Sequence, residues 1–147
     1  MTKELTGKHE IRDPIHGSIL ISSSERHILD HDFIQRLRGI RQLGFTHHSF
    51  PSATHTRFSH SIGVMHVAGK IFDTIQLPIS ERRRNQYRSL IRMTALLHDS
   101  GHGPYSHAAE YAMPPKKDLF LEDDSDERAT HEDYTVAILT QTDINDI

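Results

Sequence analysis

Residues 87–104 read YRSLIRMTALLHDSGHGP, and this stretch decides the fold class. Its apolar residues recur every three or four positions, as on one face of an α-helix, and that face carries Tyr87, Leu90, Ile91, Thr94, Leu97 and His98. Ser80 can cap the start of the helix, and the Gly- and Pro-rich residues 100–104 end it. The helix therefore brings His98, with Asp99 directly after it, to a sharp turn of the backbone.

A second amphipathic helix precedes this one. An apolar stripe begins at His60 and continues at helical spacing through Val64, Val67, Ala68, Ile71 and Ile75. Pro78 stops the helix, and we expect the stripe to face the core. On the following helix, five arginines lie mostly outside the apolar face: Arg82, Arg83, Arg84, Arg88 and Arg92. The first three of them are expected to form a solvated face.

The N-terminal third combines a hairpin with short helices. Residues 8–22 predict a small β-hairpin, because two β-prone runs flank the turn residues 13–17. Ser23 or Ser24 can cap a first helix, and a second can begin at Asp30 or Asp32 and end at Gly44.

A loop is expected at residues 45–56 and a short helical piece at 105–112. Residues 113–129 read as an acidic, mobile loop. Thr130 can cap a last helix, with Asp133 completing a capping box. The prediction is a mostly α protein in a single domain over residues 1–147.

Composition excludes several functions. The chain has 147 residues and no cysteine, so disulfides, thiolate metal sites and cysteine nucleophiles are excluded. With 17 basic and 20 acidic residues the net charge is −3, which disfavours nucleic acid as a partner. The sequence shows neither a membrane span nor a signal peptide, and we expect a cytoplasmic protein. Because 13 residues are histidine, any metal must be bound by histidine and carboxylate.

His60, His98 and Asp99 are the candidate metal ligands. Each histidine lies among apolar residues, and the turn after His98 lets Asp99 approach the same ion although neighbouring helical residues diverge by about 100°. Imidazole and carboxylate together suit Fe, Mn, Ni, Co or Zn rather than Ca²⁺.

Two ordered motifs, RFSHSIGV at 57–64 and LLHDSGHGPYSH at 96–107, resemble the HD-domain deoxynucleoside triphosphohydrolases. The likeness includes bacterial dGTPase-type members and animal members with a sterile-alpha-motif domain. It extends over residues 9–138 and includes DPIHG at 13–17, FIQRLR at 33–38 and RQLG at 41–44. The resemblance implies an HD-domain helical bundle and a metal-dependent phosphohydrolase.

The resemblance also implies roles for individual residues. His60, His98 and Asp99 match metal ligands, and the histidines that line the triphosphate site and support attack on the α-phosphate match His102, His107 and His131. Arg57 matches a phosphate contact, and Gln42 and Leu43 match positions facing the sugar. A regulatory nucleotide site at subunit contacts matches Asp13, Gln35 and Arg38. The implied partners are a nucleotide, above all a dNTP, and further copies of the chain in a homo-oligomer. A Mg²⁺ ion that accompanies the nucleotide is an additional implied cofactor.

The family's fourth metal ligand is an aspartate from a helix farther downstream, beyond the matching region of this chain. Neither Asp143 nor Asp146 has the matching context. We therefore expect a C-terminally short HD domain that is a piece of a longer protein, a short natural relative, or part of a dimer in which another chain completes the site.

Three functions stay open at this point. The first is hydrolysis of a dNTP to deoxynucleoside and triphosphate. The second is phosphodiesterase or phosphatase activity on another nucleotide, because HD sites share one ligand set. The third is a non-catalytic module that senses nucleotides or drives oligomerisation. Retention of His102, His107 and His131 favours catalysis, whereas the unmatched fourth ligand favours the module.

Overall fold

The computed structural model describes residues 9–120 and 125–146. The chain begins with the predicted hairpin, in which β1 (His9–Asp13) pairs antiparallel with β2 (Gly17–Ile21). In its turn, Asp13 Oδ1 accepts hydrogen bonds from the backbone N–H groups of Ile15 and His16 at 2.9 and 2.8 Å. Gly17 has a φ of +71°, which glycine adopts at no steric cost. The hairpin is confirmed, and residue 8 lies outside the described residues.

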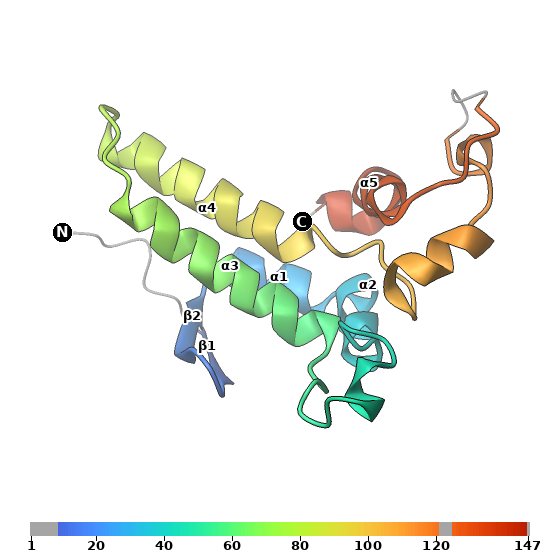
Figure 1. The fold of residues 1–147 in the computed structure, drawn as a ribbon. Coiled ribbons are helices and arrows are strands. Elements are labelled where there is room, and N and C mark those ends of the chain that lie inside the picture. Colours follow the sequence, from blue (N-terminus) through green and yellow to red (C-terminus); the bar gives the residue numbers. More distant parts are fainter. Residues whose placement is uncertain (1–8, 121–124, 147) are drawn as a thin grey trace.

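Helices form the rest of the fold, so the mostly α prediction is confirmed. The α-helices are α1 (Ser23–Asp30), α2 (Asp32–Gln35), α3 (Arg57–Thr74), α4 (Glu81–Leu97) and α5 (His131–Gln141). Figure 1 shows α3 and α4 side by side and antiparallel, with the hairpin beside α3 and α5 beyond the C-terminal end of α4. Short 3₁₀ helices lie between the α-helices, at Arg36–Gly39, Thr46–His48, Ser106–Ala112 and Lys116–Asp118, and a further one follows α5 at Asp143–Asp146.

Side-chain caps fix where these helices begin. Ser80 caps α4, and Thr130 caps α5 in a capping box with Asp133, both as predicted. The cap of α1 is Ser22 rather than Ser23 or Ser24, and it forms a capping box with Glu25. The second helix is shorter than predicted, because it becomes a 3₁₀ helix at Arg36–Gly39 and ends well before Gly44.

The hydrophobic core joins the hairpin to α1, α3, α4 and α5. Its centre consists of fully buried side chains, among them Ile19, Ile34, Leu37, Met65 and Leu96. The terminal 3₁₀ helix adds Ile144 to the same cluster.

The predicted core-facing stripe of α3 is wrong. The buried face of α3 carries Phe58, Ile62, Met65 and Phe72, whereas Val67, Ile71 and Ile75 are 39%, 58% and 45% exposed. Helix α3 is apolar on two sides, and the core takes the side with the larger side chains. The exposed side lines an apolar groove together with residues of the hairpin turn.

The prediction for α4 is partly wrong in the same way. Tyr87 and Leu90 are exposed, and the residues buried on this helix are Leu96 and Arg92. Arg92 is not in solvent, because it forms a bidentate ion pair with the equally buried Glu25 of α1.

The segment predicted as an acidic mobile loop, residues 113–129, is described except for 121–124. It contains the 3₁₀ helix Lys116–Asp118, and an isolated bridge joins Pro115 to Arg128. Its mobility stays a prediction. Among the described helices, none combines the length and the apolar character needed to cross a lipid bilayer.

Candidate functional site

Asp99 lies at the centre of the candidate site, in the turn that follows α4. His98 precedes it, and His60 comes from the second turn of α3, which packs against α4. One ligand atom from each of these three side chains lies within 4.8 Å of the other two. The structure therefore brings together the three predicted metal ligands.

Several donors surround the Asp99 carboxylate. Oδ2 accepts a hydrogen bond from Arg57 Nη1 at 2.7 Å and one from Gln42 Nε2 at 3.4 Å. Oδ1 lies 3.4 Å from His98 Nε2 and 3.7 Å from His102 Nε2. Burial raises the pKa of Asp99, but the charges of His98 and Arg57 outweigh it and hold the pKa below its usual value. Asp99 is thus ionised at neutral pH.

The donor set fits a transition metal. Burial lowers the pKa of His60, which keeps its imidazole neutral, the form that binds metal. Two imidazoles and one carboxylate are a ligand set typical of catalytic metal sites that keep positions open for water or substrate. His98 Nδ1 lies 2.7 Å from the carbonyl oxygen of Ala95, a contact that leaves its Nε2 facing Asp99.

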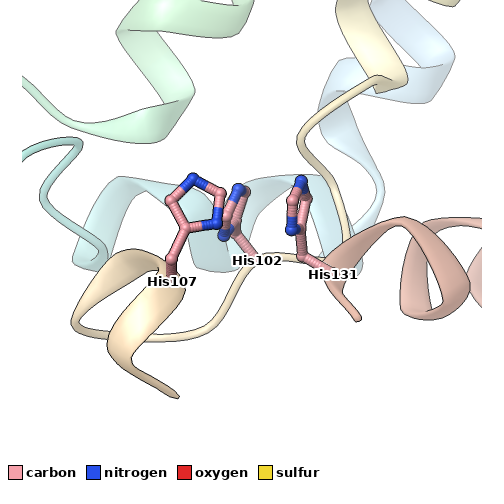
Figure 2. Close-up of side chains that lie close together, drawn as sticks. All are labelled: His102, His107 and His131. Atoms are coloured by element: carbon pink, nitrogen blue, oxygen red, sulfur yellow. The ribbon is translucent and has the colours of Figure 1, made fainter. Parts of the chain in front are cut away.

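A second cluster consists of His102, His107 and His131, and Figure 2 shows the three rings close together. The rings of His102 and His131 stack with centroids 3.7 Å apart, and His107 stands edge-on to both. Burial, aided by the charge of Arg57, lowers the pKa of His102 to about 4. His102 is therefore neutral at pH 7 and can accept a proton.

Glu110, which was not among the predicted site residues, joins two of these histidines. Its Oε1 lies 2.5 Å from His131 Nδ1 and 3.1 Å from His107 Nδ1. The hydrogen bond to His131 lowers the pKa of Glu110. The spacing of three residues between His107 and Glu110 is a signal that places both on one helical face, and it could have identified the carboxylate.

The segment 103–110, which we call the strap, follows His102 and carries His107 and Glu110. Two consecutive residues of the strap adopt a left-handed backbone. Tyr105 has a φ of 69° and Ser106 a φ of 57°, a conformation that costs roughly 1–2 kcal/mol for each non-glycine residue. Contacts hold the strap in place. Arg57 Nη2 donates to Ser106 Oγ at 2.8 Å, and the Tyr105 ring stacks on Phe45 with centroids 5.0 Å apart.

Gly101 lets α5 approach the same turn. A Cβ atom at this position would lie 2.1 Å from the His131 carbonyl oxygen and 2.4 Å from the Thr135 nitrogen. The Gly101 N–H donates to Thr135 Oγ1 at 2.9 Å. Close backbone contact at Gly101 thereby sets the distance between His131 and Asp99.

Of the three residues predicted to bind the substrate, two contact Asp99 and one is exposed at the surface. Arg57 and Gln42 both contact Asp99. Arg57 is only 1% exposed, so it contacts the carboxylate from the buried side and not from the solvent side. Leu43 is exposed in the neighbouring turn.

The residues matched to a regulatory nucleotide site fall in two places. Arg38 Nε donates to Gln35 Oε1 at 2.7 Å, and the Arg38 guanidinium lies over the Phe58 ring. Asp13 instead caps its own hairpin turn. Asp143, which lacked the context of a fourth metal ligand, lies 3.0 Å from His31 Nε2.

These features define a helical protein with a histidine- and aspartate-rich site at the C-terminal end of α4. The family that matches residues 57–147 is the HD domain. This match covers more than half of the chain, which therefore belongs to the HD-domain family. The predicted superfamily is confirmed.

Individual relatives show the same likeness. An uncharacterised protein of Methanocaldococcus jannaschii is 45% identical over 100 residues, covering 68% of this chain and 20% of that protein. The deoxynucleoside triphosphate triphosphohydrolase SAMHD1 homolog of Dictyostelium discoideum is 44% identical over 105 residues, with the same coverage of 68% and 20%. A hypothetical protein from Aquifex aeolicus has a similar crystal structure, with a TM-score of 0.69 and 33% identity over 94% of this chain and 32% of that one. The chain thus spans about a fifth to a third of the length of these relatives.

Proposed function

We propose that this chain forms the catalytic site of a metal-dependent phosphohydrolase that acts on nucleotides, with a dNTP as substrate and deoxynucleoside and triphosphate as products. The observation that carries the proposal is the position of Asp99 between a His60–His98 pair and the cluster of His102, His107 and His131. The dNTP assignment is supported by the motifs at 57–64 and 96–107 and by relatives named deoxynucleoside triphosphate triphosphohydrolases.

His60, His98 and Asp99 would hold the metal. A divalent ion at such a site polarises a phosphate oxygen and lowers the pKa of bound water. Its identity among Fe, Mn, Ni, Co and Zn stays open, as does an accompanying Mg²⁺. The buried Arg57 donates a hydrogen bond to Asp99, and this bond fixes the orientation of the carboxylate.

The reaction adds water to the α-phosphorus and breaks the bond from that phosphorus to the 5′-oxygen of the sugar. One proton leaves the attacking water, and one must reach the departing 5′-oxygen. The histidine cluster supplies groups for both transfers, because neutral imidazoles accept and imidazolium ions donate protons near neutral pH. Glu110 orients His107 and His131 through their Nδ1 atoms, which directs both Nε2 atoms away from the carboxylate.

Other sequence-based roles remain part of this proposal. Gln42 and Leu43 would face the sugar, and Arg57 would contribute positive charge near the phosphates. The regulatory nucleotide site of Asp13, Gln35 and Arg38, the homo-oligomer and the cytoplasmic location stay predictions.

The decisive experiment incubates the metal-loaded protein with each dNTP and each ribonucleotide and follows the products by ³¹P NMR and chromatography. We expect inorganic triphosphate and free deoxynucleoside, and their absence in the Asp99→Asn variant. Release of pyrophosphate or monophosphate would instead indicate the phosphodiesterase or phosphatase alternative. Nucleotide binding without turnover would identify a non-catalytic module.

A further inference from the structure

A second polar cavity lies between α3 and α4, toward the ends of these helices that do not carry His60 and His98. Its volume is about 840 Å³, within the range of small-molecule sites. Helix α3 contributes His66, Lys70 and Asp73, and β2 and α1 close one side. Lys70 follows His60 by ten residues of one helix, or about 15 Å. The cavity is therefore separate from the candidate catalytic site.

One face of α4 lines the cavity with hydrogen-bonding groups. Four of the lining residues recur at offsets of three, four and seven positions, which places them on the same side of the helix, and they are Arg82, Asn85, Gln86 and Ser89. Arg83, which comes directly after Arg82, does not line the cavity. These four residues present one cation, two amides and one hydroxyl to a common space, and Arg88 and Arg92 of the same helix also line it.

The charges around the cavity do not balance. Two acidic residues are already neutralised, because Arg88 binds Asp73 at 2.7 and 2.9 Å and Arg92 binds Glu25 at 2.6 and 3.0 Å. Lys70 and Arg82 form no ion pair or hydrogen bond within residues 9–120 and 125–146. Two positive charges therefore remain, although the whole chain carries a net charge of −3.

Arg92 adds a buried donor to the cavity wall. The side chain is only 4% exposed, and its Nε and Nη2 atoms are used by Glu25 and the Leu20 carbonyl oxygen. Its Nη1 makes no hydrogen bond within the described part of the chain. Gly69 provides the room for this placement, because a Cβ there would lie 3.1 Å from Arg92 Nη1.

His66 supplies a second polar atom without a partner. Its Nε2 is buried and makes no hydrogen bond to the described residues. Uncompensated burial of a polar atom costs free energy, and this atom belongs to a residue that lines the cavity.

We propose that this cavity is a binding site for a phosphate-bearing anion. Lys70 and Arg82 would neutralise the phosphate charge, while Arg92 Nη1 and the amides of Asn85 and Gln86 would donate hydrogen bonds to its oxygens. The charged lining disfavours an apolar ligand. Free phosphate, an inorganic polyphosphate and the phosphoryl group of a nucleotide share this chemistry, and the experiment separates them.

The test is a ¹H–¹⁵N NMR titration of the full chain with inorganic phosphate, tripolyphosphate, a deoxynucleoside monophosphate and acetate, at an ionic strength held constant with NaCl. We expect saturable shifts at residues 66, 70, 82, 85, 86 and 89 with at least one phosphate-bearing probe and none with acetate. The probe that binds most tightly identifies the source of the phosphate group.

Matched variants distinguish a specific anion site in the cavity from a nonspecific attraction of anions to positive charge. Lys70→Ala/Arg82→Ala should weaken binding at these residues at least about tenfold, equivalent to 1.4 kcal/mol. Arg83→Ala/Arg128→Ala removes the same charge elsewhere and should leave binding unchanged. Equal weakening by both pairs, acetate shifts as large as those of phosphate, or shifts confined to residues 98–107 would overturn the proposal. Asp99→Asn should retain the cavity shifts, so loss of hydrolysis and loss of this site are distinguishable.

Discussion

Arg57 and Asp99, 42 positions apart in the chain, form a buried ion pair in which Arg57 Nη1 donates to Asp99 Oδ2 at 2.7 Å. The second nitrogen of the same guanidinium, Nη2, donates to Ser106 Oγ. One side chain at the start of α3 therefore ties the candidate metal ligand to the strap that carries His107. Burial lowers the pKa of Arg57, but the charge of Asp99 opposes that shift and the pair remains ionised.

Replacing Arg57 should destabilise the metal-free protein. Arg57→Met leaves the Asp99 carboxylate buried without its cation, which typically costs about 3–5 kcal/mol. Arg57→Lys keeps the charge but cannot bridge both Asp99 and Ser106, so we expect a smaller loss of about 1.5–3 kcal/mol. Urea unfolding measures both changes. Arg83→Met, on the exposed side of α4, should stay within about 0.5 kcal/mol of wild type, and an equal cost at both positions would contradict the structural role of the ion pair.

Removing an imidazole from the first cluster should release the metal. His98→Ala deletes one of three proposed ligands, so its affinity loss should exceed the roughly 10–100-fold that changes beyond the direct ligands cause. Elemental analysis after gentle purification, followed by competition with a chelator, measures the loss. The matched control is His27→Ala, an exposed histidine of α1. Equal metal content in both variants would place the metal elsewhere.

Glu110 should affect turnover more than binding. Glu110→Gln removes the charged acceptor of the hydrogen bonds to His107 and His131, so both imidazoles are held less firmly in place. We expect kcat to fall about 10–100-fold, as for other groups that orient functional histidines, with little change in KM. Glu127→Gln, an exposed carboxylate, is the control, and a change in KM alone would argue against orientation.

The buried pair of Glu25 and Arg92 predicts a pH dependence of stability. Burial raises the pKa of Glu25, but hydrogen bonds from Arg92 and the Ser22 N–H, together with the charge of Arg92, bring the pKa below its usual 4.5. The folded state therefore binds this proton less tightly than the unfolded state. The stabilisation is present above pH 4.5 and is lost as the pH falls through the lower, folded-state value. Urea unfolding against pH should show this loss, and Glu25→Gln/Arg92→Met should reduce it.

The exposed side of α3 should promote self-association. Val67, Ile71 and Ile75 form an uncovered apolar row on α3, and Ile15 of the hairpin turn is also exposed. We expect concentration-dependent association in sedimentation velocity, and Ile71→Glu should weaken it by placing a charge in the apolar row. The control is Leu90→Glu, which introduces the same charge at an exposed leucine of α4. Association that is insensitive to Ile71→Glu would exclude this face as the contact.

Local signals in the sequence were sufficient for the starts of α4 and α5 and for the hairpin, but they placed the cap of α1 one or two residues too late. Thr130 and Asp133 form a capping box from residues three positions apart, and the hairpin turn contains its own Asp, Pro and Gly. The face of α3 was predicted wrongly because Ile62 and Val64 both belong to apolar rows at helical spacing. Periodicity does not distinguish which of two such rows meets the core.

Contacts between segments that are far apart in the sequence were harder to predict from local sequence patterns. The burial of Arg92 was not predicted, because its partner Glu25 is 67 positions away and has a local role in the capping box of α1. For the site, the motif residues His60, His98 and Asp99 were predicted together, and the structure gathers them. The involvement of Glu110 depends on the fold of the strap and on α5, which bring His131 beside it.

Gly101 limits how this sequence can vary. Alanine, the smallest possible replacement, would place its methyl carbon 2.1 Å from the His131 carbonyl oxygen, which is too close for two atoms that are not bonded. Helix α5 would therefore have to move outward together with His131. Such a shift separates His131 from His102, whose rings now stack 3.7 Å apart. In a library containing all twenty amino acids at this position, selection for function should return glycine alone, even though the residue contributes no chemical group to the reaction.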